Sequence, residues 1–326
     1  MREINVEIGG YLELEIYHGQ EYHPSAIALN SGRNCLSYLI EARKIKKIHL
    51  PVLICSSVID VCKRHDLEIQ FYPINEDFSP RVDKLDCGDG TFYFVNYYGQ
   101  LSTVEQEILS NRFDHIIIDN AQAFFQSPKD ALDTVYTCRK FFGVPDGAYL
   151  YTDAFLGYEI KQDVSYSRMS HLLGRFEAGA QAHYAEFVEN ERIIDALPLR
   201  SMSKLTHNLL RGIDYQWIKE RREENFRYLH EHLKDKNRLQ LNIPEGPFAY
   251  PLLIEHGAEI RKALQQQKIY IPTLWPNVLE IAPKGSLEYE YAANLLPLPC
   301  DQRFTIDDGI RALQDALIHA YKLNCD

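Results

Sequence analysis

A lysine and an aspartate, each at the end of a short apolar segment, are the residues with the clearest chemical potential in this chain. Asp119 ends the segment 115–119, and Lys140 closes the segment 135–140. Pyridoxal phosphate (PLP) chemistry needs a lysine amine that holds the cofactor's aldehyde as a Schiff base. It also needs an acidic partner on the pyridine nitrogen, so that the ring stays protonated and can withdraw electrons. The pair indicates this chemistry, although a lone lysine or a lone aspartate is more often a surface charge.

Three residues at the start of the first predicted helix could bind a phosphate. Ser31, Gly32 and Arg33 stand at the beginning of the segment 32–44, whose apolar residues recur at helical spacing. Backbone N–H groups at a helix N-terminus bind phosphate, and glycine allows the anion to approach closely. The alternative is a plain N-cap, in which Ser31 bonds to the first turn. Arg33 favours the anion, because a cation in the first turn opposes the helix dipole unless an anion lies nearby.

Three further polar residues lie close in sequence to the aspartate and the lysine. Thr137, three residues before Lys140, could donate a hydrogen bond to the same phosphate, or it could be an ordinary strand threonine. Gln122 would lie near the hydroxyl oxygen of the ring if Asp119 meets the nitrogen; the alternative is a polar loop residue. Arg139 could contact the phosphate or form a salt bridge, and both interpretations stay open.

Strand-like and helical patterns alternate through the first half of the chain. Such alternation predicts an α/β fold with a mostly parallel sheet covered by helices on both faces. In such sheets ligands bind beyond the carboxyl ends of the strands, where Asp119 and the turn 96–99 are expected. The predicted strands are 47–51, 67–72, 91–95, 115–119 and 148–151, and the predicted helices are 32–44, 56–64 and 103–111.

The pattern changes at about residue 165. The segment 168–196 contains few helix breakers and predicts one long helix, followed by helices at 203–211 and 215–234. Strand and helix patterns then return between 248 and 321. We therefore predict a large domain over residues 1–200, which includes the long connecting helix, and a small C-terminal α+β domain over residues 201–326.

Composition limits the classes of partner and compartment. The 326 residues carry a net charge of −11, which argues against nonspecific binding to nucleic acid or to an anionic membrane. Residues 1–7 lack the apolar core of a signal peptide, and no apolar run approaches transmembrane length. Seven cysteines without a CxxC pair predict reduced thiols and a cytoplasmic protein. His230 and His232 would point to different faces of a helix, so no metal site is predicted.

Taken in order, several short motifs resemble those of the fold-type I PLP enzymes. The resemblance is strongest to the DegT/DnrJ/EryC1/StrS group of sugar aminotransferases, and it extends over residues 25–320. The Asp-x-Ala-Gln motif followed by a lysine is more specific than the Ser-Gly segment, and the shared order carries most of the weight. The motifs are Ser31-Gly32-Arg33, Pro51, 96–100, 119–123, Lys140 and 146–148.

The resemblance implies a PLP-dependent aminotransferase that works as a homodimer. It implies a small-molecule amino donor such as glutamate. It also implies a small-molecule keto acceptor, for which nucleotide sugars are among the candidates. Lys140 would form the Schiff base and shuttle the proton. Asp119 would pair with the pyridinium nitrogen, and Gln122 would contact the ring face or its 3-hydroxyl. The phosphate would be held by Ser31, Gly32, Arg33 and Thr137, and Tyr98 would lie near the substrate.

The chain departs from that family at several places, and these leave alternatives open. Cys55 stands where the family usually has an aromatic residue that stacks on the ring. The segment 166–169 lacks the asparagine of the family's Gly-x-Asn-x-Arg-Met motif. One alternative is a non-catalytic relative that keeps the fold as a binding or regulatory module. Another keeps PLP but carries out a lyase or dehydratase reaction, because the cofactor itself supplies the difficult chemistry.

Overall fold

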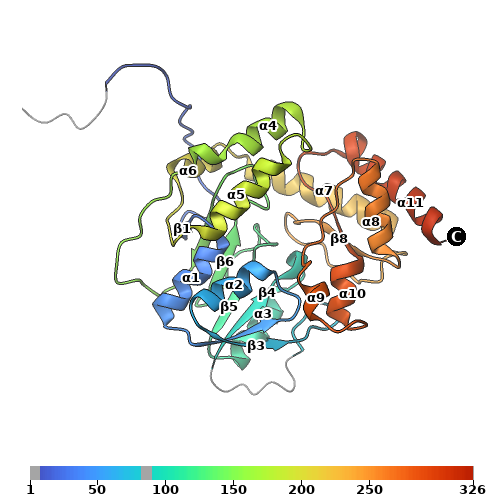
Figure 1. Ribbon diagram of the computed structural model, residues 1–326, viewed down its shortest axis with the longest axis horizontal. Coiled ribbons are helices and arrows are strands. Elements are labelled where there is room, and N and C mark those ends of the chain that lie inside the picture. Colours follow the sequence, from blue (N-terminus) through green and yellow to red (C-terminus); the bar gives the residue numbers. More distant parts are fainter. Residues whose placement is uncertain (1–7, 82–89, 326) are drawn as a thin grey trace, which may run out of the picture.

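A seven-stranded sheet forms the centre of the structure (Figure 1). The computed structural model describes residues 8–81 and 90–325, so the segment 1–7 and Cys87 lie outside the described residues. The strand order is β1-β7-β6-β5-β4-β2-β3. β2 to β6 run parallel, whereas β7 is antiparallel to both of its neighbours. The strands are β1 (Ile27–Leu29), β2 (Lys47–Pro51), β3 (Glu68–Tyr72), β4 (Thr91–Val95), β5 (Ile116–Asp119), β6 (Asp133–Thr137) and β7 (Ala148–Tyr151).

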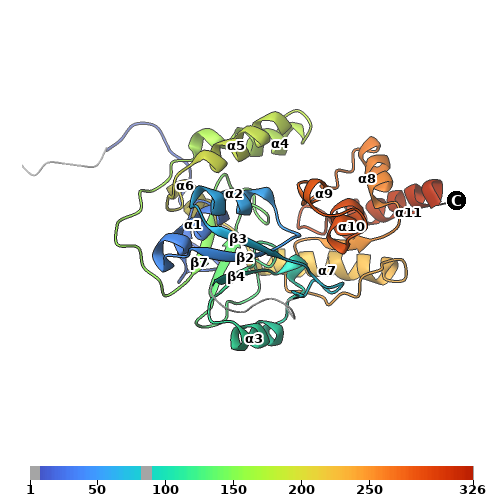
Figure 2. The same ribbon diagram turned by 60° about the horizontal axis from the view of Figure 1, so that its bottom comes forward.

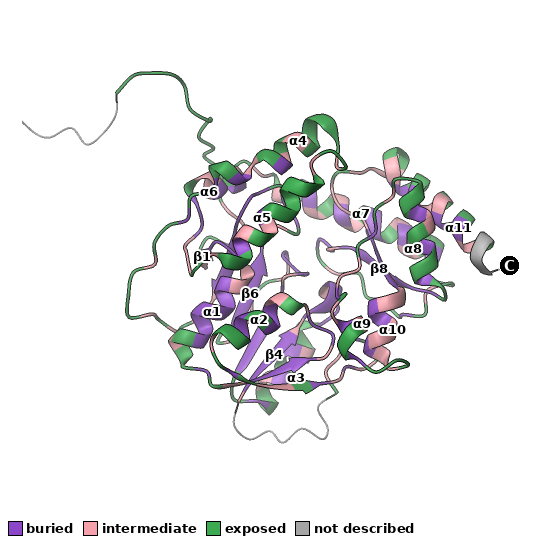
Figure 3. Cartoon of the chain, viewed as in Figure 1, coloured by how far each residue is buried: buried purple, intermediate pink, exposed green. Residues whose placement is uncertain are grey.

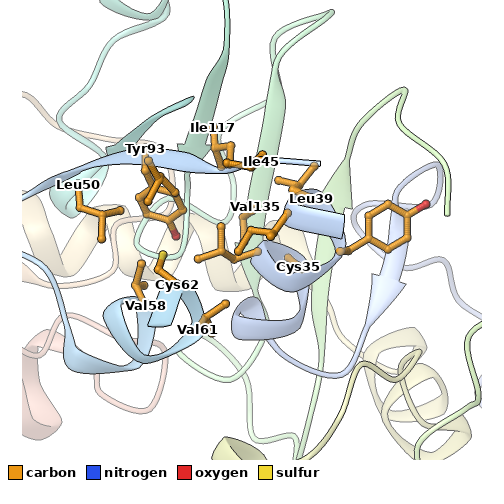
Figure 4. Packing of buried hydrophobic residues seen from close by; sticks show 14 of the residues in the cluster. Cys35, Leu39, Ile45, Leu50, Val58, Val61, Cys62, Tyr93, Ile117 and Val135 are labelled. Atoms are coloured by element: carbon orange, nitrogen blue, oxygen red, sulfur yellow. The ribbon is translucent and has the colours of Figure 1, made fainter. Parts of the chain in front are cut away.

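Helices cover both faces of this sheet, as the alternating sequence pattern predicts (Figure 2). Successive strand residues point to opposite faces. Tyr93 and Ile117 pack on the side of α1 (Gly32–Arg43) and α2 (Ser56–Arg64), as Figure 4 shows. Their neighbours in sequence, among them Phe94, pack on the side of α3 (Thr103–Arg112). The prediction of a mostly parallel, doubly covered sheet is confirmed.

The segment predicted as one long helix consists of two helices. α4 (Ser170–Ala178) ends at Gly179, and α5 (Tyr184–Ala196) begins after a short turn. Gly179 has φ 91°, a conformation that glycine adopts readily and that stops the helix. The prediction of a continuous helix over 168–196 was therefore wrong, because one glycine in an otherwise helical pattern acts here as a terminator. In Figure 3 both helices are largely exposed.

The C-terminal region forms a second core around a two-stranded antiparallel sheet, to the right of the large sheet in Figure 1. α7 joins the two regions, since Ile218 packs with the large-sheet aromatic residues and Phe226 with the second core. The domain boundary near residue 200 stays a prediction. The elements are α6 (Lys204–Arg211), α7 (Tyr215–Leu233), β8 (Tyr250–Leu253), α8 (Gly257–Gln266), α9 (Val278–Ile281), α10 (Leu287–Asn294), β9 (Leu295–Leu298) and α11 (Arg311–Cys325).

Within the described ranges, no helix combines the length and the apolar character needed to cross a membrane.

His23 lies in an aromatic cluster behind β6 and β7, with its ring centroid 4.2 Å from that of Tyr136. Burial lowers the pKa of His23 to about 4 from an ordinary value of 6.5, against the opposing effect of its hydrogen bond with the Phe124 carbonyl. At pH values between about 4 and 6.5, His23 binds a proton in the unfolded chain but stays neutral in the folded protein. The free energy of unfolding therefore decreases as the pH falls through this window.

We predict that this single group lowers the free energy of unfolding by about 2 kcal/mol between pH 7.5 and pH 5. Urea unfolding at several pH values would measure it. A His23→Phe variant should lose this part of the pH dependence, whereas a variant of the exposed His18 should retain it. The same slope in wild type and His23→Phe would contradict the assignment.

Candidate active site

A cavity of about 1100 Å³ opens at the carboxyl ends of the parallel strands. Its far wall comes from the C-terminal region and includes Tyr270, Pro272 and Asp301. A cleft at this place in a parallel sheet is where ligands are expected to bind. Five of the predicted site residues line it together: Gly32, Arg33, Asp119, Thr137 and Lys140.

Asp119 is the last residue of β5 and is buried, with 8% of its surface exposed. The Tyr93 hydroxyl donates a hydrogen bond of 2.9 Å to Oδ2, and the Ala121 backbone N–H donates one of 2.9 Å to Oδ1. Burial raises the pKa of Asp119, while the charge of Lys140 and these two hydrogen bonds act in the opposite direction. The carboxyl group is thus fixed in orientation, and each oxygen retains a lone pair for a further donor.

Lys140 lies on the turn that follows β6, three residues beyond the end of the strand at Thr137. Its side chain is exposed to the cavity, and Nζ lies 5.6 Å from the centroid of the Phe248 ring. The turn is held from the C-terminal region, because the Phe141 carbonyl accepts hydrogen bonds from Arg222 (3.2 Å) and from Gln302 (2.8 Å). Its backbone is therefore anchored while the amine remains free to reach into the cavity.

The start of α1 faces the same cavity through Gly32 and Arg33. Ser31 is buried and caps the helix, because its hydroxyl oxygen accepts a hydrogen bond of 3.3 Å from the Asn34 backbone N–H. Capping uses one of the first-turn donors, and the earlier N–H groups have no partner within a helix. A cap and an anion site can therefore coexist at this helix terminus.

Two arginines near this terminus already have acidic partners on α5. Arg33 forms ion pairs with Asp195 (2.5 Å) and Glu191 (3.4 Å), and Arg139 pairs with the same Glu191. Burial, with a further contribution from the Arg33 charge, lowers the pKa of Arg139 to about 10. Of the two interpretations of Arg139, the structure shows the salt bridge, at the edge of the predicted phosphate site.

Gln122 and Tyr98 form a contact with each other beside the cavity. Gln122 Oε1 accepts a hydrogen bond of 2.8 Å from the Tyr98 backbone N–H. Tyr98 has φ 54°, an uncommon conformation for a bulky residue, and its fully buried ring lies 6.3 Å from that of Phe248 in the cavity wall. In this structure Gln122 stabilises the turn after β4. Its predicted contact with the ring of the cofactor, and that of Tyr98 with the substrate, stay predictions.

Solved structures of other proteins share the fold of this chain. The sequence matches no protein-family model and no curated protein. Its structure is similar to a DegT DnrJ EryC1 StrS aminotransferase from Brucella abortus, with a TM-score of 0.61 and 15% identity over 91% of this chain and 85% of that one. It is also similar to the putative sugar aminotransferase Spr1654 from Streptococcus pneumoniae in its PMP form, with a TM-score of 0.66 and 12% identity over 94% and 93%. The chain has the fold of these aminotransferases. The resemblance drawn from the motifs is thus confirmed at the level of the fold.

A third similar structure is NtdA from Bacillus subtilis with bound PMP, with a TM-score of 0.64 and 15% identity over 91% of this chain and 73% of that one. At these identities the likeness establishes the fold-type I architecture. The chemistry of this chain depends on its own residues.

The residues around the cavity fit the ring of a PLP group. Near the expected phosphate, the ion pairs of Arg33 limit how this arginine could contribute to binding. At the ring end, the buried Asp119 carboxyl has a spare acceptor position, and Lys140 shares its cavity. At the phosphate end, a side chain built on Gly32 would approach only Val135, at 3.8 Å, so the space in front of the helix terminus is open. The acidic partners of Arg33 would have to move if that arginine is to contact a phosphate.

Sequence reasoning missed two residues that the structure places in this site, Tyr93 and Glu191. Tyr93 lies on the same face of β4 as Val95, which is paired with Asp119, so strand alternation could have located it. Glu191 and Asp195 stand four residues apart on α5 and therefore share a helix face, but nothing in the sequence links that face to Arg33. Cys55 lines the cavity, where the expected aromatic residue is absent.

Proposed function

We propose that this protein is a PLP-dependent aminotransferase that transfers an amino group from a donor such as glutamate to a keto acceptor. The observation that carries the proposal is that Lys140 and Asp119 line one cavity at the strand ends of an aminotransferase fold. Two unrelated surface charges would not be expected to line the same cavity. A keto sugar is the acceptor class we favour, because the similar structures include proteins described as sugar aminotransferases.

PLP, when bound, supplies an electron sink that lets a proton move between the α-carbon of the donor and the cofactor. In this site Lys140 would hold the cofactor through its amine and then carry that proton. Asp119 would accept the N–H of the ring nitrogen at its spare lone pair. Gly32 and the first turn of α1, with Thr137, would hold the phosphate through N–H and hydroxyl donors.

A half-reaction with glutamate tests the reaction class. We expect the PLP-loaded protein, mixed with glutamate alone, to convert its cofactor to pyridoxamine phosphate and to release one equivalent of 2-oxoglutarate. Absorption spectra and product analysis would measure both. A protein that binds PLP but leaves glutamate unchanged, while it eliminates groups from other amino compounds, would instead be a lyase or dehydratase.

A specific observation supports a second candidate, a non-catalytic relative that uses the fold as a binding module. Arg33 and Arg139 are paired with Glu191 and Asp195, so the positive charges near the predicted phosphate site are already neutralised. Binding separates the two candidates, because a protein of the second class would show no saturable binding of PLP.

We also propose that the protein is a cytoplasmic homodimer. α4 and α5 lie beside the cavity and expose large apolar side chains, among them Phe176 (92% exposed) and Tyr184 (64%). Large exposed apolar side chains that lie on neighbouring helices are typical of interaction surfaces, and a second copy is the partner that the fold suggests. Cys35, Cys55, Cys62, Cys138 and Cys300 are free thiols, which supports a reducing compartment.

A further inference from the structure

Tyr93 has no part in the function proposed above, yet its hydroxyl is bound to the residue on which that function depends. We propose that Tyr93 is a positioning residue that keeps the Asp119 carboxyl ionised and correctly oriented for a cationic partner in the cavity. The hydroxyl donates to Oδ2 of Asp119 at 2.9 Å, and both side chains line the cavity. The meaning of this pair for catalysis rests on the proposed function, whereas the pairing itself does not.

The surroundings of Tyr93 allow its hydroxyl little freedom. The ring is 2% exposed and packs in the core cluster that includes Leu50, Val58 and Cys62, as Figure 4 shows. Within the described ranges the hydroxyl's hydrogen bond is the one to Asp119, and most of the side chains around the ring are apolar. A hydrogen bond to an ionised carboxylate between two such buried side chains is stronger than one between neutral groups.

Asp119 needs this support because burial disfavours its charge. Three groups oppose the effect of burial: Lys140, the Ala121 N–H and the Tyr93 hydroxyl. The contribution of Lys140 depends on its own charge, which changes when the amine reacts. Lys140 and Tyr93 are the two side chains that stabilise the carboxylate. The contact of Tyr93 does not depend on whether the Lys140 amine is charged.

Other titratable groups near Asp119 do not replace Tyr93. Cys35 of α1 and Tyr97 after β4 both interact with the Asp119 charge, and burial raises the pKa of each well above neutral pH. Both groups therefore stay uncharged, and neither donates a hydrogen bond to Asp119 among the described residues. Tyr93 is thus the neutral side chain that acts directly on the carboxylate.

Tyr93→Phe is the direct test, because phenylalanine fills the same cluster and removes only the hydroxyl. The first measurement uses the cofactor-free protein with ¹³C-labelled aspartate, and the Asp119 signal is assigned by its loss in Asp119→Asn. We expect the pKa of Asp119 in Tyr93→Phe to rise by about one unit, given the strength of a hydrogen bond to a charged group. The second measurement is PLP affinity, which we expect to fall about tenfold.

Tyr136→Phe is the matched control, since Tyr136 is equally buried and its hydroxyl donates to the Gln126 carbonyl at 2.8 Å rather than to Asp119. This control should lose stability without a change in the titration of Asp119. An unchanged Asp119 titration in Tyr93→Phe would overturn the inference, whatever the effect on PLP. If the wild-type protein fails to bind PLP, the proposed function is wrong, but the titration still decides the role of Tyr93.

Discussion

Replacing Lys140 with alanine should abolish the half-reaction with glutamate and leave the fold intact. The lysine side chain is exposed to the cavity, and its turn is anchored through backbone carbonyls, so truncation removes little packing. The lost amine would have served both to hold the cofactor and to move a proton. Loss of a positioned proton-transfer group alone lowers rates by about 10² to 10⁴-fold, so we expect activity to fall at least about 10³-fold.

The control for this variant is Lys262→Ala, because Lys262 is an exposed lysine on α8, outside the cavity. Circular dichroism and thermal unfolding should show that both variants fold like the wild-type protein. Full activity in Lys140→Ala, measured as 2-oxoglutarate formed per protein, would contradict the assignment of this lysine. Equal loss in both variants would point to a general effect of removing charge.

Asp119→Asn should produce two effects of opposite sign. Without the negative charge, the ring nitrogen of the cofactor loses the partner that keeps it protonated. Removing one electrostatic contact to developing charge typically costs about 10² to 10³-fold in rate, and we expect a loss in this range for the half-reaction. The cofactor-free variant, however, should be at least as stable as the wild type, because it no longer buries a charge.

The sign of this stability effect can be checked by its pH dependence. Since burial raises the pKa of Asp119 above its ordinary value of 3.8, the folded state binds its proton more tightly than the unfolded chain does. The carboxyl group therefore lowers stability above its folded pKa. The advantage of Asp119→Asn should be largest at neutral pH and vanish as the pH falls below 3.8.

Asp133→Asn is a matched control for this experiment. Asp133 is also buried and begins the neighbouring strand, but it pairs with Arg43 (2.5 Å) instead of lining the cavity. Its variant should lose stability, because Arg43 loses the buried one of its two acidic partners and keeps only the exposed Asp153, and should bind PLP like the wild type. Destabilisation by both substitutions, together with unchanged PLP affinity, would exclude the role given to Asp119.

The parts of the fold that the sequence predicts well are those with local signals. Helix α1 begins at the predicted Gly32, and β2 has the predicted bounds, because periodicity and capping are encoded within each segment. The placement of Asp119 and Lys140 in one cavity also follows from local signals, since parallel strands end at the same edge of a sheet.

The remaining features depend on contacts between distant segments, which one sequence does not reveal. Glu191 meets Arg33 only because α5 folds back over the start of α1. Gln122 contacts the Tyr98 backbone because two strand-end turns meet, although its motif suggested a contact with the cofactor. The break at Gly179 shows the limit of local signals as well, since an isolated glycine within a helical pattern is often tolerated.

The most direct test of the central claim is to trap the cofactor on its lysine. The purified protein is mixed with PLP, reduced with borohydride, digested, and the labelled peptide is mapped by mass spectrometry. We predict a visible absorption band before reduction and one label per chain, on Lys140. No band, or label distributed over exposed lysines, would contradict the account and favour a protein that keeps the aminotransferase fold without its chemistry.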